Sequence, residues 1–469
     1  MRKWFNYFFL TVTQSPLSLA GSTITTASAF TFLALFAFES LGYSKGPYFG
    51  ILTFMIVPAV FVAGLVLIPV GIWVYRRRLA QGALPRILPV IDLNNERTRK
   101  VVLAFAALTI VNLGILGIAS YKGLHVMESN AFCGTTCHTV MQPEHTAHLR
   151  SPHARVNCVD CHIGAGANWF VKSKLSGSWQ VVATAFNLYP RPIPYPIHNL
   201  RPARETCEQC HWPEKFVGDR LKVITRYKED EKNTELKTVL LLRIGGIEGR
   251  ESHGIHWHVD RNVNVRYLGD EKRDNIYDVE LIKPDGSVVK YATQAERPKD
   301  ARLQWRNMDC VDCHNRPTHI YRMPSDDLDR SIQEGKIDRS LPFIRREGLR
   351  LLKVDYSSHD DARKKIREGL TAFYAQQYPA VAAEKKEFVG RAADELGNLY
   401  SYNVFPAMKV KWGTYPNRIG HENSPGCQRC HDGDHKTAGG AAISDDCDTC
   451  HSLLAQEEEN PKILAELQP

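Results

Sequence analysis

All twelve cysteines of this 469-residue chain lie in six closely spaced pairs, and each pair is followed directly by a histidine. Five pairs have the form Cys-x-x-Cys-His, which is the attachment signal for covalent haem c. One such motif alone fits a redox dithiol or half of a zinc site, but five regular copies with no cysteine left over predict haem c. The six motifs are Cys133/Cys137-His138, Cys158/Cys161-His162, Cys207/Cys210-His211, Cys310/Cys313-His314, Cys427/Cys430-His431 and Cys447/Cys450-His451.

The first motif differs from the other five because three residues, not two, separate Cys133 from Cys137. A thiol pair without haem is the alternative at this position, so the sequence predicts six haems, or five if this motif is empty. Met141 follows closely, and either His138 or Met141 can ligate the first iron. A haem with a methionine ligand, or with one open side, would suit the point at which electrons enter.

Each motif histidine supplies one axial ligand, and an electron-carrying haem needs a second, usually histidine or methionine. Six of the eighteen histidines belong to the motifs, which leaves twelve. His256 and His258 are expected on a strand, where residues two apart point to one face, so that one of them can reach a haem; a plain surface strand, or a small metal site with His253, is the alternative. His125 and His359 are expected to be ordinary polar residues. The distal candidates are His145, His148, His153, His256, His258, His319, His421 and His435.

The elements that position these motifs begin in the membrane. Basic residues at 76–78 and 97–100 flank one loop, which is therefore expected in the cytoplasm. Two basic residues in Met1–Lys3 indicate a cytoplasmic N-terminus. Three crossings then deliver residue 122 to the outer face, where haem c is attached. The three apolar segments, each long enough to cross a hydrocarbon core of about 30 Å, are 16–41, 48–75 and 101–121.

A cleaved signal peptide is the rival interpretation of the N-terminus. Arg2 and Lys3, the apolar run Trp4–Val12 and the sequence Ala27-Ser-Ala29 resemble one loosely. Cleavage would leave a new N-terminus outside, and the remaining crossings would place the haem motifs in the cytoplasm, which contradicts their chemistry. The segment is therefore expected to stay, with the aromatic residues of 4–9 in the membrane interface.

Beyond the membrane segments the pattern changes twice. Residues 216–305 contain β-rich runs, and the turn Pro284–Gly286 predicts a hairpin. Residues 324–404 are expected to be helical, and the tail from Gln456 is expected to be solvated. The β-rich runs are 221–227, 238–244, 263–267, 278–282 and 287–291, and the residues at helical spacing are Ile366, Leu370 and Phe373, then Phe388, Ala392, Leu396 and Tyr400.

The predicted fold class is therefore a membrane protein. Three N-terminal transmembrane helices precede an extracytoplasmic multihaem c domain, mostly α and irregular, with an inserted β module. The expected domains are a membrane domain at 1–122, a three-haem domain at 123–215, a β-rich insertion at 216–305, and a C-terminal domain at 306–469 with three haem motifs and a helical spacer.

The segment Cys137-His-Thr-Val-Met-Gln-Pro-Glu144, followed by Ser151-Pro-His153 and Cys158-Val-Asp-Cys-His162, resembles the NapC/NirT/NrfH family of membrane-anchored cytochromes c. The likeness covers roughly residues 100–215. Members take electrons from the quinol pool and feed periplasmic reductases. The whole chain is similar to the larger, ImcH-type inner-membrane members, which are associated with respiratory reduction of extracellular acceptors such as metals.

The resemblance implies roles for single residues. Met141 would be the unusual ligand of the first iron, although the family methionine stands two residues after the histidine and here it stands three after. His153 would be the distal ligand of a later haem. Lys174, or Lys172, would lie in the quinol site. The matching position for the family's acidic residue holds none, and Glu144 is the substitute candidate.

These features favour a quinol dehydrogenase that passes electrons from menaquinol through the haems to a periplasmic cytochrome c or reductase. A terminal reductase of a small oxyanion such as nitrite is the alternative, as is a haem-bearing anchor that docks a separate reductase. The expected location is the bacterial inner (cytoplasmic) membrane, with the haem domain in the periplasm. The net charge of +8 is a weak pointer to an anionic partner, and no nucleic-acid motif accompanies it. A homo-oligomer is compatible with the sequence.

Overall fold

The computed structural model describes residues 15–40, 56–81, 92–136, 138–164, 167–197, 201–212, 215–248, 251–260, 262–298 and 302–467. The chain forms two compact units, Met1–Thr136 and Cys137–Pro469. The basic residues of Met1–Lys3 and the aromatic segment 4–9 lie outside the described residues. Ala27-Ser-Ala29 lies within a long helix.

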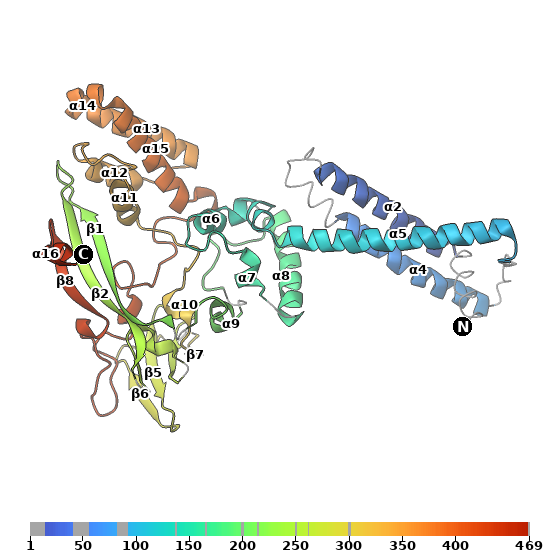
Figure 1. Cartoon of the computed structure of the whole chain (residues 1–469), viewed down its shortest axis with the longest axis horizontal. Coiled ribbons are helices and arrows are strands. Elements are labelled where there is room, and N and C mark those ends of the chain that lie inside the picture. Colours follow the sequence, from blue (N-terminus) through green and yellow to red (C-terminus); the bar gives the residue numbers. More distant parts are fainter. Residues whose placement is uncertain are drawn as a thin grey trace. The chain divides into compact units, whose positions relative to one another are not determined.

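Three helices of the first unit are long and apolar enough to cross a membrane, as predicted (Figure 1). Two of their bounds differ from expectation. The second helix continues through Arg77 and Arg78, which form its last turn. The third has 32 residues, and at 1.5 Å per residue it is about 48 Å long, more than a hydrocarbon core needs. The helices are α2 (Pro16–Ser40), α4 (Val57–Ala80) and α5 (Glu96–Met127).

Helices α2 and α4 approach closely because small residues line their contact. A Cβ atom added to Gly64 would collide with the Thr25 hydroxyl, and one added to Gly71 would collide with Ser18. The Ser15 hydroxyl donates a 3.0 Å hydrogen bond to the Gly71 carbonyl. Such close packing with side chain to backbone hydrogen bonds is typical of helix pairs in membranes.

The second unit carries most haem motifs on short helices and adds two antiparallel sheets. One sheet is built around the long strand β2, which pairs with β1, β3 and β8, and the other has the order β6-β5-β4-β7. The short helices are α6 (His138–Leu149), α7 (Cys158–His162), α9 (Ala203–Cys207) and α10 (Cys310–Cys313), with α8 (Ala167–Ala185) longer. The strands are β1 (Gly218–Tyr227), β2 (Glu235–Glu248), β3 (Glu251–His253), β4 (Asn264–Gly269), β5 (Ile276–Ile282), β6 (Val288–Ala292), β7 (Gln304–Asn307) and β8 (His451–Glu458).

The five predicted β runs all lie on or overlap strands, and the hairpin between β5 and β6 is confirmed. Its turn uses Gly286 at φ +81°, a conformation that glycine adopts without strain. The tail was expected to be solvated and frayed; Gln456–Glu458 are exposed, as expected, but they are not frayed. These residues belong to β8, which pairs with β2 along 237–242. The unpaired backbone N–H and C=O groups at the edge of β2 are available to pair with this segment. The polar sequence of the tail does not predict that pairing.

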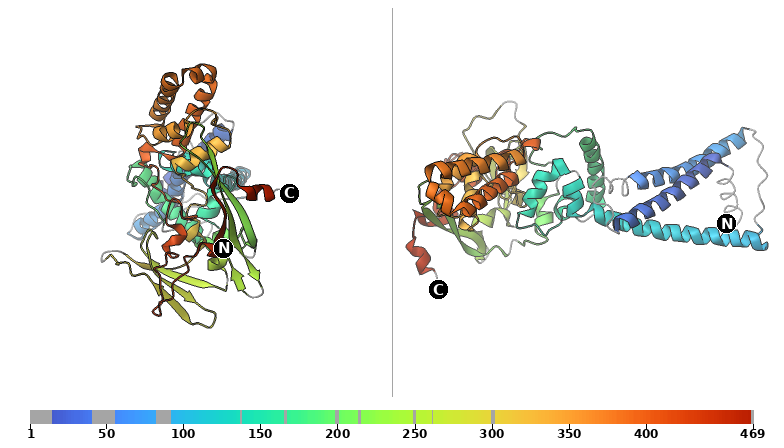
Figure 2. Two further views of the ribbon diagram at one scale, coloured as in Figure 1. Left: turned by 90° about the vertical axis from the view of Figure 1, so that its left-hand side faces the viewer. Right: turned by 90° about the horizontal axis from the view of Figure 1, so that it is seen from above.

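Residues 324–403 form a helical bundle with its own core. Figures 1 and 2 show this bundle at one end of the second unit and strands β5 and β6 at the other. Ile366, Leu370, Ala392, Leu396 and Tyr400 are buried as predicted. Phe388 is 37% exposed, and the next residue, Val389, is buried instead. The buried face of the helix therefore differs from the prediction by one residue at this point. The helices are α11 (Pro324–Gln333), α12 (Ile344–Leu352), α13 (His359–Gln377), α14 (Pro379–Glu384) and α15 (Lys386–Asn403).

Candidate haem centres

Two motif helices owe their start to an aspartate inside the haem motif. In Cys158-Val-Asp160-Cys161, the Asp160 carboxylate accepts a 3.2 Å hydrogen bond from the Asn157 N–H. In Cys310-Val-Asp312-Cys313, Asp312 accepts a 2.8 Å bond from the Asp309 N–H. Both are capping boxes, which satisfy backbone donors that a helix start leaves open. The aspartate before the second cysteine therefore stabilises the start of the short helix that carries both cysteines.

Among the haem-attachment cysteines that the structure describes, three are exposed rather than enclosed, and Cys210 is one of them. It lies in a turn just beyond α9, which ends at Cys207. Its N–H donates a 3.1 Å hydrogen bond to the Cys207 carbonyl, so a single backbone turn holds this pair, whereas a capped helix holds the second and fourth. A thioether bond is covalent and does not require a buried sulfur, so attachment at Cys210 stays a prediction. The other two exposed cysteines are Cys161 and Cys447.

The cysteines of motifs two to six form a continuous row within the second unit. Each motif has a thiol close enough to a thiol of the next to share a hydrogen bond or to shift its pKa. The pKa of Cys313 is raised to about 11, mainly by burial and secondly by Cys427 of the next motif. Haems attached along this row would follow one another in sequence order. The neighbouring thiols are Cys161 with Cys207 and Cys210, Cys207 with Cys310, Cys313 with Cys427, and Cys427 with Cys450.

Every motif histidine from the second motif onward faces a histidine from outside the motifs. Two imidazoles that ligate one metal at about 2 Å each place their ring centroids roughly 6 Å apart. The observed separations match this requirement, so the residues fit an iron with two histidine ligands. The pairs are His162 with His319 at 6.2 Å, His211 with His153 at 6.0 Å, His314 with His256 at 6.3 Å, His431 with His258 at 5.8 Å, and His451 with His421 at 6.3 Å.

Four of the facing histidines have their Nδ1 atom beside a backbone carbonyl. A hydrogen bond from Nδ1–H fixes the tautomer and leaves Nε2 as the metal ligand. Sequence reasoning did not find these carbonyls, because a backbone carbonyl carries no residue signature and, except for Ile255, they are 12 or more residues away in sequence. The contacts are His153 to Pro317 O at 3.3 Å, His256 to Ile244 O at 2.9 Å, His258 to Ile255 O at 2.9 Å, and His319 to Glu144 O at 3.0 Å.

The protonation of these rings also suits ligation. Burial lowers the pKa of His162, His258 and His314 below its ordinary value, and in each case the facing histidine lowers it further. The neutral imidazole is the form that binds a metal ion. At these three positions the surroundings therefore favour the uncharged ring.

Comparison with known proteins agrees with this chemistry. A family profile described as the NapC/NirT cytochrome c family, N-terminal region, matches residues 96–196. Over 453 residues the chain is 42% identical to the cytochrome c-type protein ImcH of Geobacter sulfurreducens, covering 95% of this chain and 89% of that relative. The chain belongs to the NapC/NirT family of c-type cytochromes. No solved structure matches it.

Family membership establishes covalently bound haem c, a membrane location and a role in electron transfer for this NapC/NirT cytochrome. Haem c supplies an iron centre that takes up and releases one electron at a time. The three candidate spans and the mixed helical and β second unit agree with a membrane-anchored cytochrome.

The prediction that His256 and His258 share a strand face was wrong. Both lie in the 3-10 helix η4 (Ile255–Val259) between β3 and β4. A 3-10 helix has about three residues per turn, so residues two apart point to different sides. The two rings accordingly face two different motif histidines.

The remaining distal candidates of this NapC/NirT cytochrome are His145, His148 and His435. Both ring nitrogens of His435 face acceptors, with Nδ1 3.0 Å from Asp432 and Nε2 3.2 Å from the Ile276 carbonyl, which leaves neither for iron. His148 places Nε2 3.1 Å from Val156 O. Burial lowers the pKa of His145 on α6, and His148 lowers it further.

Glu144 lies among charged and aromatic side chains in the second unit. Its carboxylate is 3.1 Å from Nδ1 of His319 and 3.5 Å from the guanidinium of Arg316. The two lysines predicted for the quinol site, Lys172 and Lys174, both lie on α8. The Nζ atom of Lys172 is 4.7 Å from the centroid of the Trp169 ring. Through its contact with His319, Glu144 thus helps to hold a candidate iron ligand in place. The sequence alone did not indicate this role.

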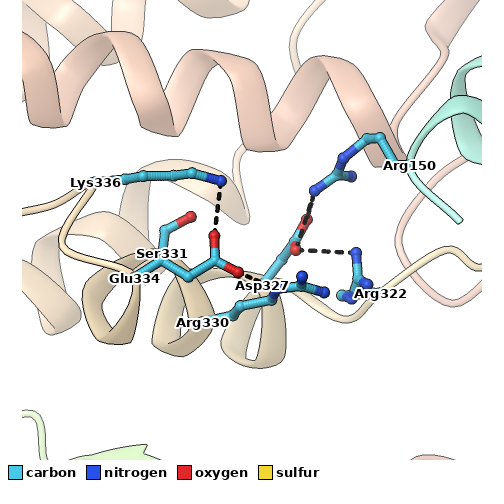
Figure 3. A pocket seen from close by; sticks show the side chains of 7 residues that line it. All are labelled: Arg150, Arg322, Asp327, Arg330, Ser331, Glu334 and Lys336. Carbon is cyan, nitrogen blue, oxygen red and sulfur yellow. Dashed lines mark hydrogen bonds and ion pairs between the residues drawn. The ribbon is translucent and has the colours of Figure 1, made fainter. Parts of the chain in front are cut away.

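One pocket is lined by four basic residues and two acidic ones, and each basic side chain is ion-paired with one of the two acids (Figure 3). The cavity measures about 90 Å³, and its lining, as the structure describes it, contains no histidine. Asp327 pairs with Arg150 and Arg322, and Glu334 pairs with Arg330 and Lys336. Such paired charges give no support to an oxyanion reduction site here.

Proposed function

We propose that the protein is a membrane-bound quinol dehydrogenase that delivers electrons from menaquinol, through about six c-type haems, to a periplasmic cytochrome c or reductase. The observation that carries this proposal is the row of five paired histidines along consecutive motifs. Paired axial histidines suit electron transfer, because both faces of the iron are closed to substrate.

The chemistry requires a proton acceptor at the entry point. Menaquinol becomes menaquinone by losing two electrons and two protons, and the electrons leave one at a time to the oxidised acceptor. Lys172 and Lys174 on α8 are our candidates for the quinol site, with a neutral amine as the base. Glu144 is a weaker candidate, because Arg316 and His319 already hold its carboxylate.

Membrane orientation supports the same proposal. Arg77 and Arg78 end α4, while Arg97, Arg99 and Lys100 lie in the first turns of α5. We place this basic side in the cytoplasm by the positive-inside bias. The chain would then leave α5 on the periplasmic side of the inner membrane, directly before the first motif.

Reduction of the protein by menaquinol tests the proposal. In proteoliposomes, we expect menaquinol to reduce the haems and a quinol-site inhibitor to block this reduction. Lys172→Gln and Lys174→Gln together should slow it roughly 100-fold, the usual scale for loss of a general base. Reduction by dithionite and haem content serve as controls and should not change. A wild-type protein that menaquinol does not reduce would exclude the proposed function.

The first motif is proposed to carry a haem despite its extra residue. Residues Phe132–Thr136 form a π-helical turn, which contains one more residue per hydrogen-bonded turn than an α-helix. A π-helical turn can accommodate one inserted residue. Residues four positions apart in the sequence then lie on a similar side of the helix. Cys137 itself lies outside the described residues. Met141 stands three residues after His138 on α6, and both remain candidates for the iron.

A haem count checks this assignment. Pyridine haemochrome analysis and intact mass are expected to give six haems per chain. Replacing both Cys133 and Cys137 by alanine should remove one haem and leave five. If wild type and variant both carry five, the first motif is an empty thiol pair.

A terminal reductase is the second candidate, and the geometry disfavours it. That function needs an iron with an open side, whereas five motif histidines already face a second histidine. A haem-bearing anchor for a separate reductase overlaps with the main proposal, because its haems would still conduct electrons.

A further inference from the structure

Both histidines of η4 come from one turn in the β-rich insertion, yet each faces a motif histidine from elsewhere in the chain. His256 lies 6.3 Å from His314, with the two rings within 6° of parallel. His258 lies 5.8 Å from His431, at 85°. The fourth and fifth motifs thus meet the same five-residue turn.

The side chain between these histidines anchors the turn. Trp257 is partly buried and packs against the core cluster of the second sheet, which includes Val265 and Tyr267. The Trp257 ring also contacts the His258 ring, with centroids 5.4 Å apart at 76°, while the two histidines face different motif histidines, as residues two apart in a 3-10 helix do. The packing of Trp257 is therefore one of the contacts that hold both rings in place.

The backbone entering η4 is equally constrained. Gly254 has φ +80°, and a Cβ atom there would lie 2.7 Å from the Arg243 carbonyl oxygen and from Gly245 Cα. No other residue fits without displacing β2. The His256 Nδ1 hydrogen bond to Ile244 O ties the turn to the same stretch of β2. At the far end, Arg204 donates a 2.9 Å hydrogen bond to the Val259 carbonyl.

We propose that η4 is a double ligand clamp, in which His256 and His258 are the distal ligands of two successive haem irons held by His314 and His431. The β insertion then serves to complete two haem centres and to fix their mutual position through a spacing of two residues. This inference rests on haem loading of the fourth and fifth motifs, and it does not depend on menaquinol as the donor.

Ligand exchange tests the clamp in the full-length membrane protein. His256→Met and His258→Met are each expected to convert one histidine-ligated haem into a histidine–methionine haem. The change is visible in the low-spin electron paramagnetic resonance signals and as one haem with a raised midpoint potential. The two variants should affect different haems, and the double variant should affect two.

Two further variants complete the test. Gly254→Ala should perturb the same two haems at once, because it displaces the whole turn. His359→Gln is the matched control; its Nε2 lies 2.7 Å from the Val404 carbonyl, and all haem signals should stay unchanged. Haem content confirms that each variant is loaded. The clamp is overturned if either methionine variant leaves every haem signal as in wild type, or if both alter one and the same haem. If Gly254→Ala does not accumulate, the methionine variants decide.

Discussion

Replacing His319 by alanine is expected to leave one haem high-spin and to slow electron delivery beyond it by more than about tenfold. His319 faces His162 of the second motif at 6.2 Å. It is held there by the Glu144 carbonyl and carboxylate. Alanine removes the ring, so the iron at His162 would lose its second protein ligand.

The size of the effect follows from reduction potentials. Loss of a histidine ligand raises the potential of an iron centre, so that onward transfer becomes uphill. For a one-electron carrier, each 59 mV lowers the equilibrium constant of that step about tenfold. Stopped-flow absorbance after addition of menaquinol would follow the later haems, and electron paramagnetic resonance would count high-spin haems.

His145→Gln is a suitable comparison, because His145 lies on α6 without facing a motif histidine among the described residues. It is expected to retain five haems with paired histidines. A His319→Ala protein that also keeps all five low-spin signals would show that another side chain ligates the iron at His162.

Asp312→Ala is expected to cause the largest loss of stability, about 3–5 kcal/mol. Asp312 is 2% exposed and accepts hydrogen bonds from the Tyr267 hydroxyl at 2.5 Å and from Arg273 at 3.2 Å. Burial raises the pKa of Tyr267 well above its ordinary value, and Asp312 raises it further. Alanine would leave the half-buried guanidinium of Arg273 and the buried phenol of Tyr267 without this acceptor.

The equivalent residue of the second motif provides a matched control. Asp160 caps its helix as Asp312 does, but it is exposed. Asp160→Ala should therefore cost only about 1 kcal/mol, the usual effect of losing a helix cap. Thermal unfolding of the two variants, followed by circular dichroism, measures the difference. Equal losses in the two variants would mean that the buried contacts of Asp312 contribute little.

The sequence predicted the elements that depend on local pattern. The apolar spans, the β runs and the helical stripe around Ile366 and Leu370 follow from periodicity, and the structure has them. The haem motifs were also evident, because covalent attachment requires two cysteines and a histidine at fixed spacing. Their surroundings were not evident, since the same motif leaves Cys210 exposed and Cys430 buried.

Which histidine faces which motif was beyond local pattern. His319 meets His162 across 157 positions of sequence, and only tertiary packing decides that contact. The strand prediction for His256 and His258 failed for a related reason. Gly254 at φ +80° and the burial of Trp257 turn this segment into η4, overriding its alternation.

The long reach between partner histidines has a consequence for biogenesis. In the proposed periplasmic orientation the second unit would be exported starting from its N-terminal end, so His153 would be present before His211 appears and the third centre could be completed early. The centre at His162 must wait for His319, which emerges after the third and fourth motifs. Strand β8 begins at His451, the histidine of the sixth motif, so it can join β2 only after the first five motifs have been made. Haem insertion must therefore act on a chain that is still largely open, and a C-terminal truncation before His451 would leave that assembly unfinished.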